Sequence, residues 1–284
     1  MTTSESGPPP THIRTFHPRR GRIGPVRAQS LSELWPAWGF DIGTPEPAET
    51  GTEAEAEADA TSSTADAAAA ADGPRAFDQA ELFGQRLGAP ARPLVLEIGC
   101  GMGEATVERA AADPDRDYLG VDVHTPGLGN LLMLARARGL DNVRAARGDA
   151  VELLRDLIKP GSVDTIQVFF PDPWPKARHH KRRIIRPELV SLMRERLRPG
   201  GMLHCATDWA DYAEQMLQVL SADPGLVNAA AAIASPAGVG ADAGAAGVDA
   251  PGFTPRPDWR PVTKFERRAL EAGREVFDLV FIAR

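Results

Sequence analysis

The chain has little cysteine and no long apolar run, and each shortage excludes a class of protein. With only Cys100 and Cys205 among 284 residues, it lacks a disulfide framework and has no CxxC pair that would begin a zinc site. No apolar stretch approaches the roughly 20 residues of a membrane-spanning helix, and the first residues lack the apolar core of a secretory signal. We therefore expect a soluble cytoplasmic protein without a metal ion.

The net charge of −7 hides a segregated distribution of charge. Residues 44–73 carry eight acidic residues and no basic one, whereas residues 11–30 carry five arginines and no acid. Without 44–73, the chain holds 31 acidic and 32 basic residues. Segregated positive charge is typical of proteins that bind a polyanion, even where the total charge is negative.

Composition divides the chain into three parts. Residues 1–43 are predicted to form a basic N-terminal arm with a tryptophan-bearing segment. Residues 44–76 are predicted to form an acidic, alanine-rich disordered linker, because they have too few large apolar side chains to order themselves; an alanine-rich helix is the alternative. Residues 77–284 are predicted to form one folded domain, with 229–250, rich in alanine and glycine, as a flexible loop.

Within 77–284, short apolar runs alternate with amphipathic stretches. Strands are predicted at 94–98, 118–123, 143–147, 163–170, 201–206 and 276–282. Helices are predicted at 104–112, 128–138, 151–158, 187–197 and 212–220. This alternation predicts an α/β fold with a mostly parallel, twisted sheet and helices on both faces. Ligands of such sheets bind at the carboxyl ends of the strands, where the motifs described next fall.

The turn after the first predicted strand carries Glu97 and the glycines Gly99, Gly101 and Gly103. Glycines let the backbone approach a ligand closely and leave the N–H groups of the following helix free to bind it. The dinucleotide fingerprint is GxGxxG, whereas the spacing here is GxGxG and Glu104 opens the helix, where a carboxylate would repel a pyrophosphate. Glu97 could pair with a cationic ammonium or sulfonium group. The motif favours S-adenosylmethionine over a tight turn without a ligand.

Two aspartates follow the next two predicted strands. Asp122 ends the second strand, where a carboxylate can accept hydrogen bonds from both ribose hydroxyls of adenosylmethionine or of NAD. Asp149 follows the third strand and could accept the adenine amino group, or it could cap the helix that starts near Val151. Position alone leaves both interpretations of Asp149 open. His124 could line the same pocket or cap a helix.

The most specific stretch, FFPDPWPK at 169–176, follows the fourth predicted strand. Three prolines in five residues exclude a helix and hold Asp172 and Trp174 on a stiff loop. An acid beside an aromatic ring suits a flat heterocycle. The basic run that follows is predicted to contact phosphates, with a solvated charged surface as the alternative. Its members are Arg178, His179, His180, Lys181, Arg182 and Arg183.

Other polar residues carry weaker signals. Asp208 ends the fifth predicted strand on the same edge, and the TKFE stretch at 263–266 precedes the last strand, but a surface turn explains either one. His204 and Cys205 lie inside a strand pattern and are expected in the core.

Together these motifs resemble the bacterial tRNA (guanine-N7-)-methyltransferases. The resemblance covers about 11–43 and 77–284 apart from 229–250. It rests on RTFHPRRGR at 14–22, LEIGCGMGE at 96–104, GVDVH at 120–124, FPDPWPKARHHKRR at 170–183, ATDW at 206–209 and RPVTKFE at 260–266. It implies a Rossmann-like class I methyltransferase fold with a C-terminal antiparallel strand, S-adenosylmethionine as cofactor and tRNA as partner. The usual substrate of the family is the guanine at position 46 in the variable loop. We expect a monomer or a homodimer.

The resemblance also implies roles for single residues. Glu97, Asp122, Asp149 and Asp172 correspond to adenosylmethionine-site residues, and Asp172 is also the catalytic residue. The corresponding substrate-site positions are Lys176, Asp208, Thr263, Lys264, Phe265 and Glu266, and residues 178–183 correspond to a tRNA-contacting stretch. The acidic insertion at 44–73 departs from the compact family pattern and leaves the boundaries open.

The chemistry agrees with this resemblance. Guanine N7 has a free lone pair, so no proton must leave before methyl transfer, and the main task is in-line placement. Asp172, with Glu266 as a second candidate, could accept the N1–H and amino protons of guanine and stabilise the cationic product. Two alternatives stay open: a methyltransferase acting on an exocyclic amine of RNA or DNA, and a non-catalytic tRNA-binding protein. The acidic set Glu97, Asp122 and Asp149 argues against the second.

Overall fold

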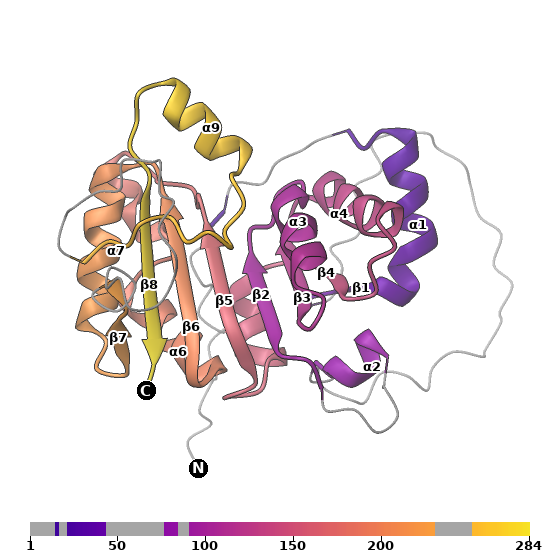
Figure 1. Ribbon diagram of the computed structural model, residues 1–284, viewed down its shortest axis with the longest axis horizontal. Helices are drawn as coiled ribbons and strands as arrows, with labels where there is room; N and C mark the ends of the chain where they lie inside the picture. The colour runs from indigo at the N-terminus through magenta and orange to yellow at the C-terminus, as the bar shows by residue number, and fades with distance from the viewer. Residues whose placement is uncertain (1–14, 17–21, 44–76, 85–90, 231–251) are drawn as a thin grey trace, which may run out of the picture.

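Within the described residues, one eight-stranded sheet organises the fold (Figure 1). The computed structural model describes residues 15–16, 22–43, 77–84, 91–230 and 252–284. The strands are β1 (Gly39–Asp41), β2 (Leu94–Ile98), β3 (Asp117–Asp122), β4 (Val143–Arg147), β5 (Val163–Phe169), β6 (Leu197–Thr207), β7 (Leu226–Asn228) and β8 (Phe277–Ala283). The predicted linker at 44–76 and nearly all of the predicted loop at 229–250 lie outside the described residues.

Helices connect most of these strands. They are α1 (Pro25–Trp38), α2 (Gln79–Phe83), α3 (Glu104–Ala112), α4 (Thr125–Ala137), α5 (Ala150–Glu152), α6 (Pro187–Arg196), α7 (Ala210–Ala222) and α9 (Lys264–Glu271), with a π-helical turn η1 (Leu153–Leu157) and a 3₁₀-helix η2 (Ala177–Arg182). The helix expected at 151–158 is thus a short α-helix that continues as a π-helix. No helix in the described part of the chain is both long enough and apolar enough to cross a membrane.

The strand order is β1-β4-β3-β2-β5-β6-β8-β7. All pairs from β1 to β6 are parallel, whereas β8 runs antiparallel to both β6 and β7. This arrangement confirms the expected α/β fold, with a mostly parallel sheet and an antiparallel C-terminal strand. β7, a three-residue strand at the edge beyond β8, was not expected from the sequence.

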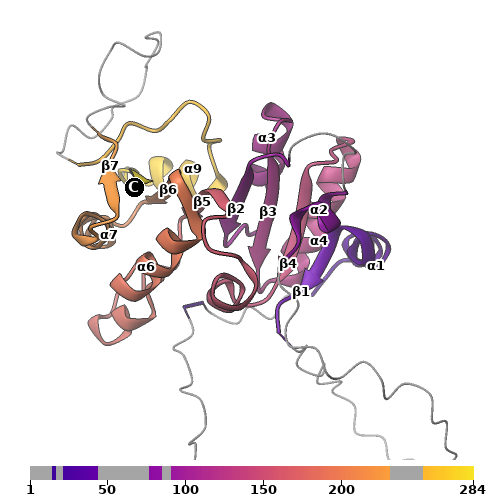
Figure 2. The same ribbon diagram turned by 90° about the horizontal axis from the view of Figure 1, so that it is seen from below.

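Successive side chains of a strand point to opposite faces of the sheet, so the strands contribute to two separate apolar clusters. On β2, Leu94, Leu96 and Ile98 belong to a cluster completed by η1, α6 and α7, whereas Val95 belongs to one completed by α3, α4 and α1. Helices therefore cover both faces of the sheet (Figure 2). Parallel strands buried on both faces explain the continuous apolar runs seen in the sequence.

The second half of the predicted arm is part of this sheet. Residues of β1 pair in parallel with β4, for example Phe40 with Ala146, and α1 packs along α4. The Arg147 guanidinium lies 2.5 Å from the Asp41 carboxylate and 5.1 Å from the centre of the Trp35 ring. The tryptophans of α1 thus anchor the segment to the domain, so residues 25–43 do not form an extended arm.

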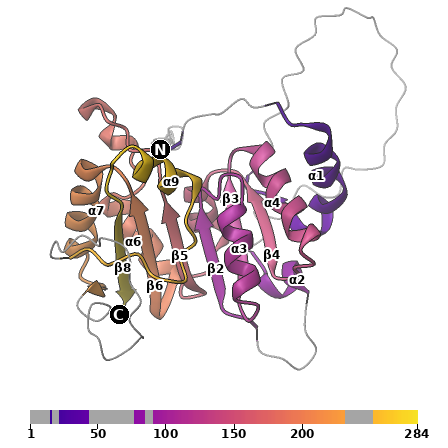
Figure 3. The same ribbon diagram turned by 45° about the horizontal axis from the view of Figure 1, so that its top comes forward.

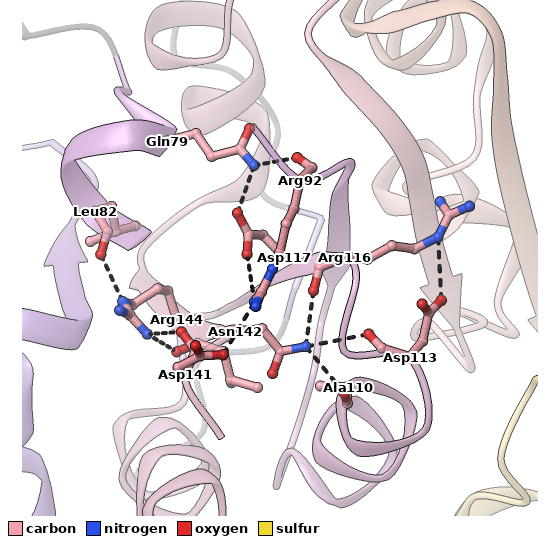
Figure 4. A network of polar contacts seen from close by, with 11 residues as sticks. Gln79, Leu82, Arg92, Ala110, Asp113, Arg116, Asp117, Asp141, Asn142 and Arg144 are labelled. Atoms are coloured by element: carbon pink, nitrogen blue, oxygen red, sulfur yellow. Dashed lines mark hydrogen bonds and ion pairs between the residues drawn. The ribbon is translucent and has the colours of Figure 1, made fainter. Parts of the chain in front are cut away.

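A polar network secures the amino edge of the sheet, opposite the motifs (Figure 4). Gln79 of α2 donates to the Asp117 carboxylate at 2.8 Å and to the carbonyl of Arg92 at 2.7 Å. Arg144 of β4 donates to the carbonyl of Leu82 at 2.7 Å, also in α2. This network attaches the short α2 to the starts of β3 and β4 and leaves the carboxyl edge free for a ligand.

Candidate active site

A pocket opens at the carboxyl edge of the sheet, where the ends of β2, β3, β4 and β5 meet. The pocket is lined by the glycine turn, the ends of β3 and β5, the proline-rich loop, the short segment at 15–16 and one residue of α9. α9 lies beyond the ends of β5 and β6 (Figures 1 and 3). The predicted site residues that line the pocket are Gly99, Gly101, Asp122, Asp172 and Phe265.

The glycine turn has a backbone that only glycine adopts without strain. Gly99, Gly101 and Gly103 all have positive φ, at 78°, 59° and 76°. A Cβ added at Gly99 would meet nothing within 4 Å, so the space beside it is open toward the pocket. Gly103 has another role: a Cβ there would come within 2.6 Å of Leu131, so its absence lets α3 pack against α4. Gly103 does not line the pocket.

Asp122 is held in a single orientation by two backbone N–H groups. Gly101 N donates to Oδ2 and His124 N donates to Oδ1, both at 2.8 Å. The carboxylate therefore ties the glycine turn to the start of α4 while it faces the pocket. His124 lines the pocket, as one interpretation of it expected. It also occupies the N-cap position of α4, but its side chain makes no capping hydrogen bond.

Glu97 lies behind the pocket and not in its wall. Its side chain is buried and accepts a 2.7 Å hydrogen bond from the hydroxyl of Thr106 in α3. Burial raises the pKa of Glu97 to about 7, and the charge of Asp122 adds to that rise although the Thr106 hydrogen bond opposes it. Pairing of Glu97 with a cationic ligand group stays a prediction.

Asp149 caps the helix that follows β4. Its Oδ1 accepts from Val151 N at 2.8 Å, which confirms the capping interpretation. Its side chain is buried, and its neighbours Gly148 and Ala150 line the pocket in its place. Contact of Asp149 with adenine stays a prediction.

The proline-rich loop holds Asp172 at the pocket through an unusual backbone. Phe170 and Trp174 have φ of 51° and 46°, a left-handed conformation that costs non-glycine residues on the order of 1–3 kcal/mol each. Trp174 is buried, and its Nε1 donates to the carbonyl of Thr15 at 3.4 Å. The contacts of the buried Trp174 ring hold the loop in this conformation despite its cost, with Asp172 in the wall of the pocket.

The basic run following this loop divides into two groups. Arg178 and Lys181 are exposed and His179, His180 and Arg182 partly exposed, with the Arg182 guanidinium 5.0 Å from the centre of the Trp174 ring. Arg183 differs, because its side chain is only 1% exposed and is paired with Asp211. Contact of Arg183 with RNA stays a prediction, but the burial of its guanidinium and its pairing with Asp211 argue against it.

The TKFE stretch forms the start of α9. Thr263 is the N-cap residue and accepts from Glu266 N at 3.1 Å. Phe265 lines the pocket, and its ring stacks on that of Phe170 with centroids 6.2 Å apart and planes at 22°. The Lys264 ammonium lies 5.4 Å from the centre of the Phe265 ring. Two aromatic rings thus stand beside Asp172.

Glu266 points away from the pocket into a buried charge network. Arg260, itself buried, donates to Glu266 through Nη1 at 2.6 Å and Nη2 at 3.2 Å, and to Asp278 through Nη2 at 2.9 Å. Asp278 also contacts His204 Nε2 at 2.7 Å, and burial lowers the pKa of His204. His204 and Cys205 are core residues, as expected. The suggestion that Glu266 acts directly on guanine does not fit this geometry.

Two further predicted substrate residues lie outside the pocket lining. Asp208 pairs with Arg274, whose Nε donates to Oδ2 at 2.9 Å, and Lys176 is exposed at the start of η2. Thr15, Phe16 and Arg260 were not expected at the site, although all three lie in the stretches RTFHPRRGR and RPVTKFE. Their presence in those stretches was the available signal, and nothing in the local pattern showed their contacts.

The pocket's residues fit an adenosyl ligand without phosphates. The open space at Gly99 admits a ligand against the backbone, and Asp122 presents a carboxylate that could accept from ribose hydroxyls. Glu104, exposed in the first turn of α3, adds negative charge where a pyrophosphate would bind. The carboxylates at the pocket therefore favour a nucleoside that carries a positive charge.

Comparisons with known proteins agree with one another on the family of this chain. A family model described as a putative methyltransferase matches residues 91–237. A tRNA (guanine-N(7)-)-methyltransferase from Streptomyces coelicolor is 47% identical over 269 residues, which cover 95% of this chain and 80% of the relative. A protein of the same description from Halorhodospira halophila is 45% identical, over 97% of this chain and 96% of the relative. Another from Paraburkholderia xenovorans is 42% identical, over 96% of this chain and 84% of the relative.

Proposed function

Because this chain belongs to the tRNA (guanine-N(7)-)-methyltransferase family, we propose that it methylates N7 of a guanine in tRNA with S-adenosylmethionine as donor. The observation that carries the proposal is the meeting of Asp122, Gly99 and Asp172 in one pocket, with Phe170 and Phe265 beside it. We further propose that the guanine is that at position 46 of the variable loop. Because tRNA is its substrate, we place the protein in the cytoplasm.

On the donor side, the chain's task is to hold the nucleoside. Asp122 would accept hydrogen bonds from the ribose hydroxyls, since its orientation is already fixed by Gly101 N and His124 N. Gly99 and Gly101 would pack against the ligand, and Asp149, beside the pocket residues Gly148 and Ala150, would accept from the adenine amino group. The donor would supply an electrophilic methyl group on a sulfonium centre, and Glu97, buried behind the pocket, would favour that positive charge when it is ionised.

On the acceptor side, guanine N7 already has its lone pair, so positioning dominates. Asp172 would accept the N1–H and amino protons of guanine and so fix the ring. As methylation makes the purine cationic, the same carboxylate would stabilise the developing charge. Phe170 and Phe265 offer flat faces against which a base could stack. Asp172 would then orient the guanine and stabilise the positive charge that develops on it, and no general base is required.

The exposed basic residues beside the loop would hold the tRNA backbone. Arg178, Lys181 and Arg182 lie directly after the loop that carries Asp172, so a phosphate bound there would place its nucleotide near the pocket. Contacts of this kind add affinity without reading sequence.

A transcript that lacks N7 at one position tests this proposal. Two tRNAs are compared, one with guanosine at position 46 and one with 7-deazaguanosine there, which keeps the N1–H and amino groups. We expect methylation of the first only. Equal methylation of both would favour an exocyclic amine as the acceptor, and no methylation of either, together with absent adenosylmethionine binding in calorimetry, would favour a non-catalytic tRNA-binding protein.

A further inference from the structure

Arg183 connects the proline-rich loop to α7. Its Nε donates to the carbonyl of Pro173 at 2.9 Å, and its two terminal nitrogens donate to Gln215 and Asp211 of α7, each at 2.5 Å. The guanidinium also lies 4.6 Å from the centre of the Tyr212 ring. One buried side chain therefore joins the residue after Asp172 to three residues of a single helix.

The loop needs an external donor because it can supply few of its own. Pro171, Pro173 and Pro175 have no backbone N–H, and Phe170 and Trp174 have left-handed φ that their side chains disfavour. Phe170 N is bound to Ala206 O at 2.8 Å, which fixes the start of the loop to β6. The contact from Arg183 to Pro173 fixes its middle, immediately beside Asp172.

Trp174 and Arg183 hold the loop through different partners. The Trp174 ring contacts Arg182 and His179, which follow the loop in the chain, whereas Arg183 connects the loop to α7. Arg183 has five N–H donors in a planar fork, so it can hold a carbonyl, an amide oxygen and a carboxylate at the same time. A lysine in its place could not do this with one nitrogen.

We propose that Arg183 is a positioning residue: it braces the loop that carries Asp172 against α7, and it makes no contact with RNA. The proposal rests on the proposed function, since it concerns how Asp172 is held for methyl transfer. It separates Arg183 from the exposed members of the basic run, with which it shares a sequence motif but not a surface.

The ion pair with Asp211 makes the proposal testable without loss of the fold. The Asp211 side chain is 64% exposed, and its hydrogen bond with Arg183 lowers its pKa. When Arg183 is replaced, Asp211 returns to water and no charge is left buried. Arg183→Gln therefore removes the brace at a modest cost to stability, and Asp211→Asn weakens it from the solvent side.

The experiment compares three variants with the parent: Arg183→Gln, Arg183→Lys and Asp211→Asn. Each is assayed for kcat and KM with tRNA, for melting temperature, and for the salt dependence of tRNA binding. We expect Arg183→Gln to lower kcat by roughly 10- to 100-fold, because a displacement of about 1 Å at a reacting centre can cost that much. Arg183→Lys should restore little of this loss, and Asp211→Asn should lower kcat by a smaller factor. The salt slope should equal that of the parent in all three.

Arg178→Gln is the matched control, since it removes the same charge from the exposed part of the run. Its effect should appear as a raised KM and a salt slope shallower by roughly 0.7–0.9, the change expected for one lost phosphate contact. The proposal is overturned if Arg183→Gln behaves like Arg178→Gln, or if both Arg183→Gln and Asp211→Asn retain the parent's kcat. Failure of the proposed function is a separate result, because the parent itself would then form no 7-methylguanosine.

Discussion

The carboxylate of Glu266 lies against the guanidinium of Arg260, with Nη1 2.6 Å from Oε2 and Nη2 3.2 Å from Oε1. Both side chains are buried, and Arg260 also binds Asp278 of β8. The guanidinium lies within 6 Å of the ring centres of Phe169 and Phe170. Glu266 thus fastens the start of α9 to the sheet, while Phe265, one residue earlier, faces the pocket.

This pairing predicts that Glu266 contributes to stability. Glu266→Gln should lower the free energy of unfolding by about 2 kcal/mol, because a charge-assisted hydrogen bond is lost inside the protein while Arg260 keeps Asp278. Urea unfolding measures this change. Glu271→Gln, at the exposed end of the same helix, is the control and should change stability by less than about 0.5 kcal/mol. Unchanged stability of Glu266→Gln with a large loss of turnover would instead place Glu266 on the substrate.

Asp172 should be essential to turnover but not to the fold. Asp172→Ala removes the group that orients guanine and stabilises the developing charge, and loss of one such preorganised contact typically costs on the order of 10²–10³ in rate. Asp172→Asn keeps the shape and removes the charge, so it should recover only part of the loss. Single-turnover assays at saturating adenosylmethionine measure both variants. Turnover close to that of the parent in Asp172→Ala would contradict the assignment.

The exposed basic residues should govern the electrostatic part of tRNA binding. Replacing Arg178, Lys181 and Arg182 together with glutamine should lower the slope of log affinity against log salt by roughly 2 to 3, since each phosphate contact contributes roughly 0.7–0.9. Replacing Arg116 and Arg198, which lie at the opposite edge of the sheet, should leave the slope unchanged. Filter binding at several salt concentrations measures the slopes, and equal slopes for both sets would mean that the basic run only faces solvent.

The raised pKa of Glu97 predicts a pH-dependent stability. Between pH 4.5 and about 7, the unfolded chain loses a proton that the folded chain keeps, so the free energy of unfolding falls as pH rises through this window and levels off above it. Glu97→Gln removes this penalty. Without cofactor, the variant should be more stable than the parent by about 3 kcal/mol at pH 8, with a much smaller excess at pH 5.

Urea unfolding at the two pH values measures the effect of Glu97→Gln. Glu104→Gln, an exposed glutamate of the next helix, is the control and should show no such dependence. An excess stability of Glu97→Gln that is the same at both pH values would mean that the carboxyl group is ionised throughout the range.

Much of the fold followed from local patterns. β2, β4 and α3 have the bounds expected from the sequence, because their apolar periods and the flanking glycines and charges agree with one another. The structure of residues 25–43 did not follow from local patterns, because Pro36 lies inside α1 and β1 has only three residues. Its order comes from long-range contacts, such as Arg147 with Asp41 and Trp35, that no local pattern contains.

The site was predicted at the level of motifs and less well at the level of side chains. Asp122, Asp172, Gly99 and Gly101 line the pocket, as expected for residues that follow the strands of a parallel sheet. Phe265 reaches the same pocket from α9. Arg183 and Glu266 do not, although they belong to the same motifs. Whether a charged residue faces solvent or a buried partner depends on elements distant in sequence, here α7 for Arg183 and the Arg260 segment for Glu266.

Identification of the methylated nucleoside tests the central claim most directly. The purified protein is incubated with methyl-labelled S-adenosylmethionine and unmodified tRNA, and the tRNA is then digested to nucleosides and separated by chromatography. The account predicts that the label appears as 7-methylguanosine, and that Asp172→Ala yields on the order of 10²–10³-fold less of it in the same time. Label in N2-methylguanosine or N6-methyladenosine, or no labelled nucleoside at all, would contradict it.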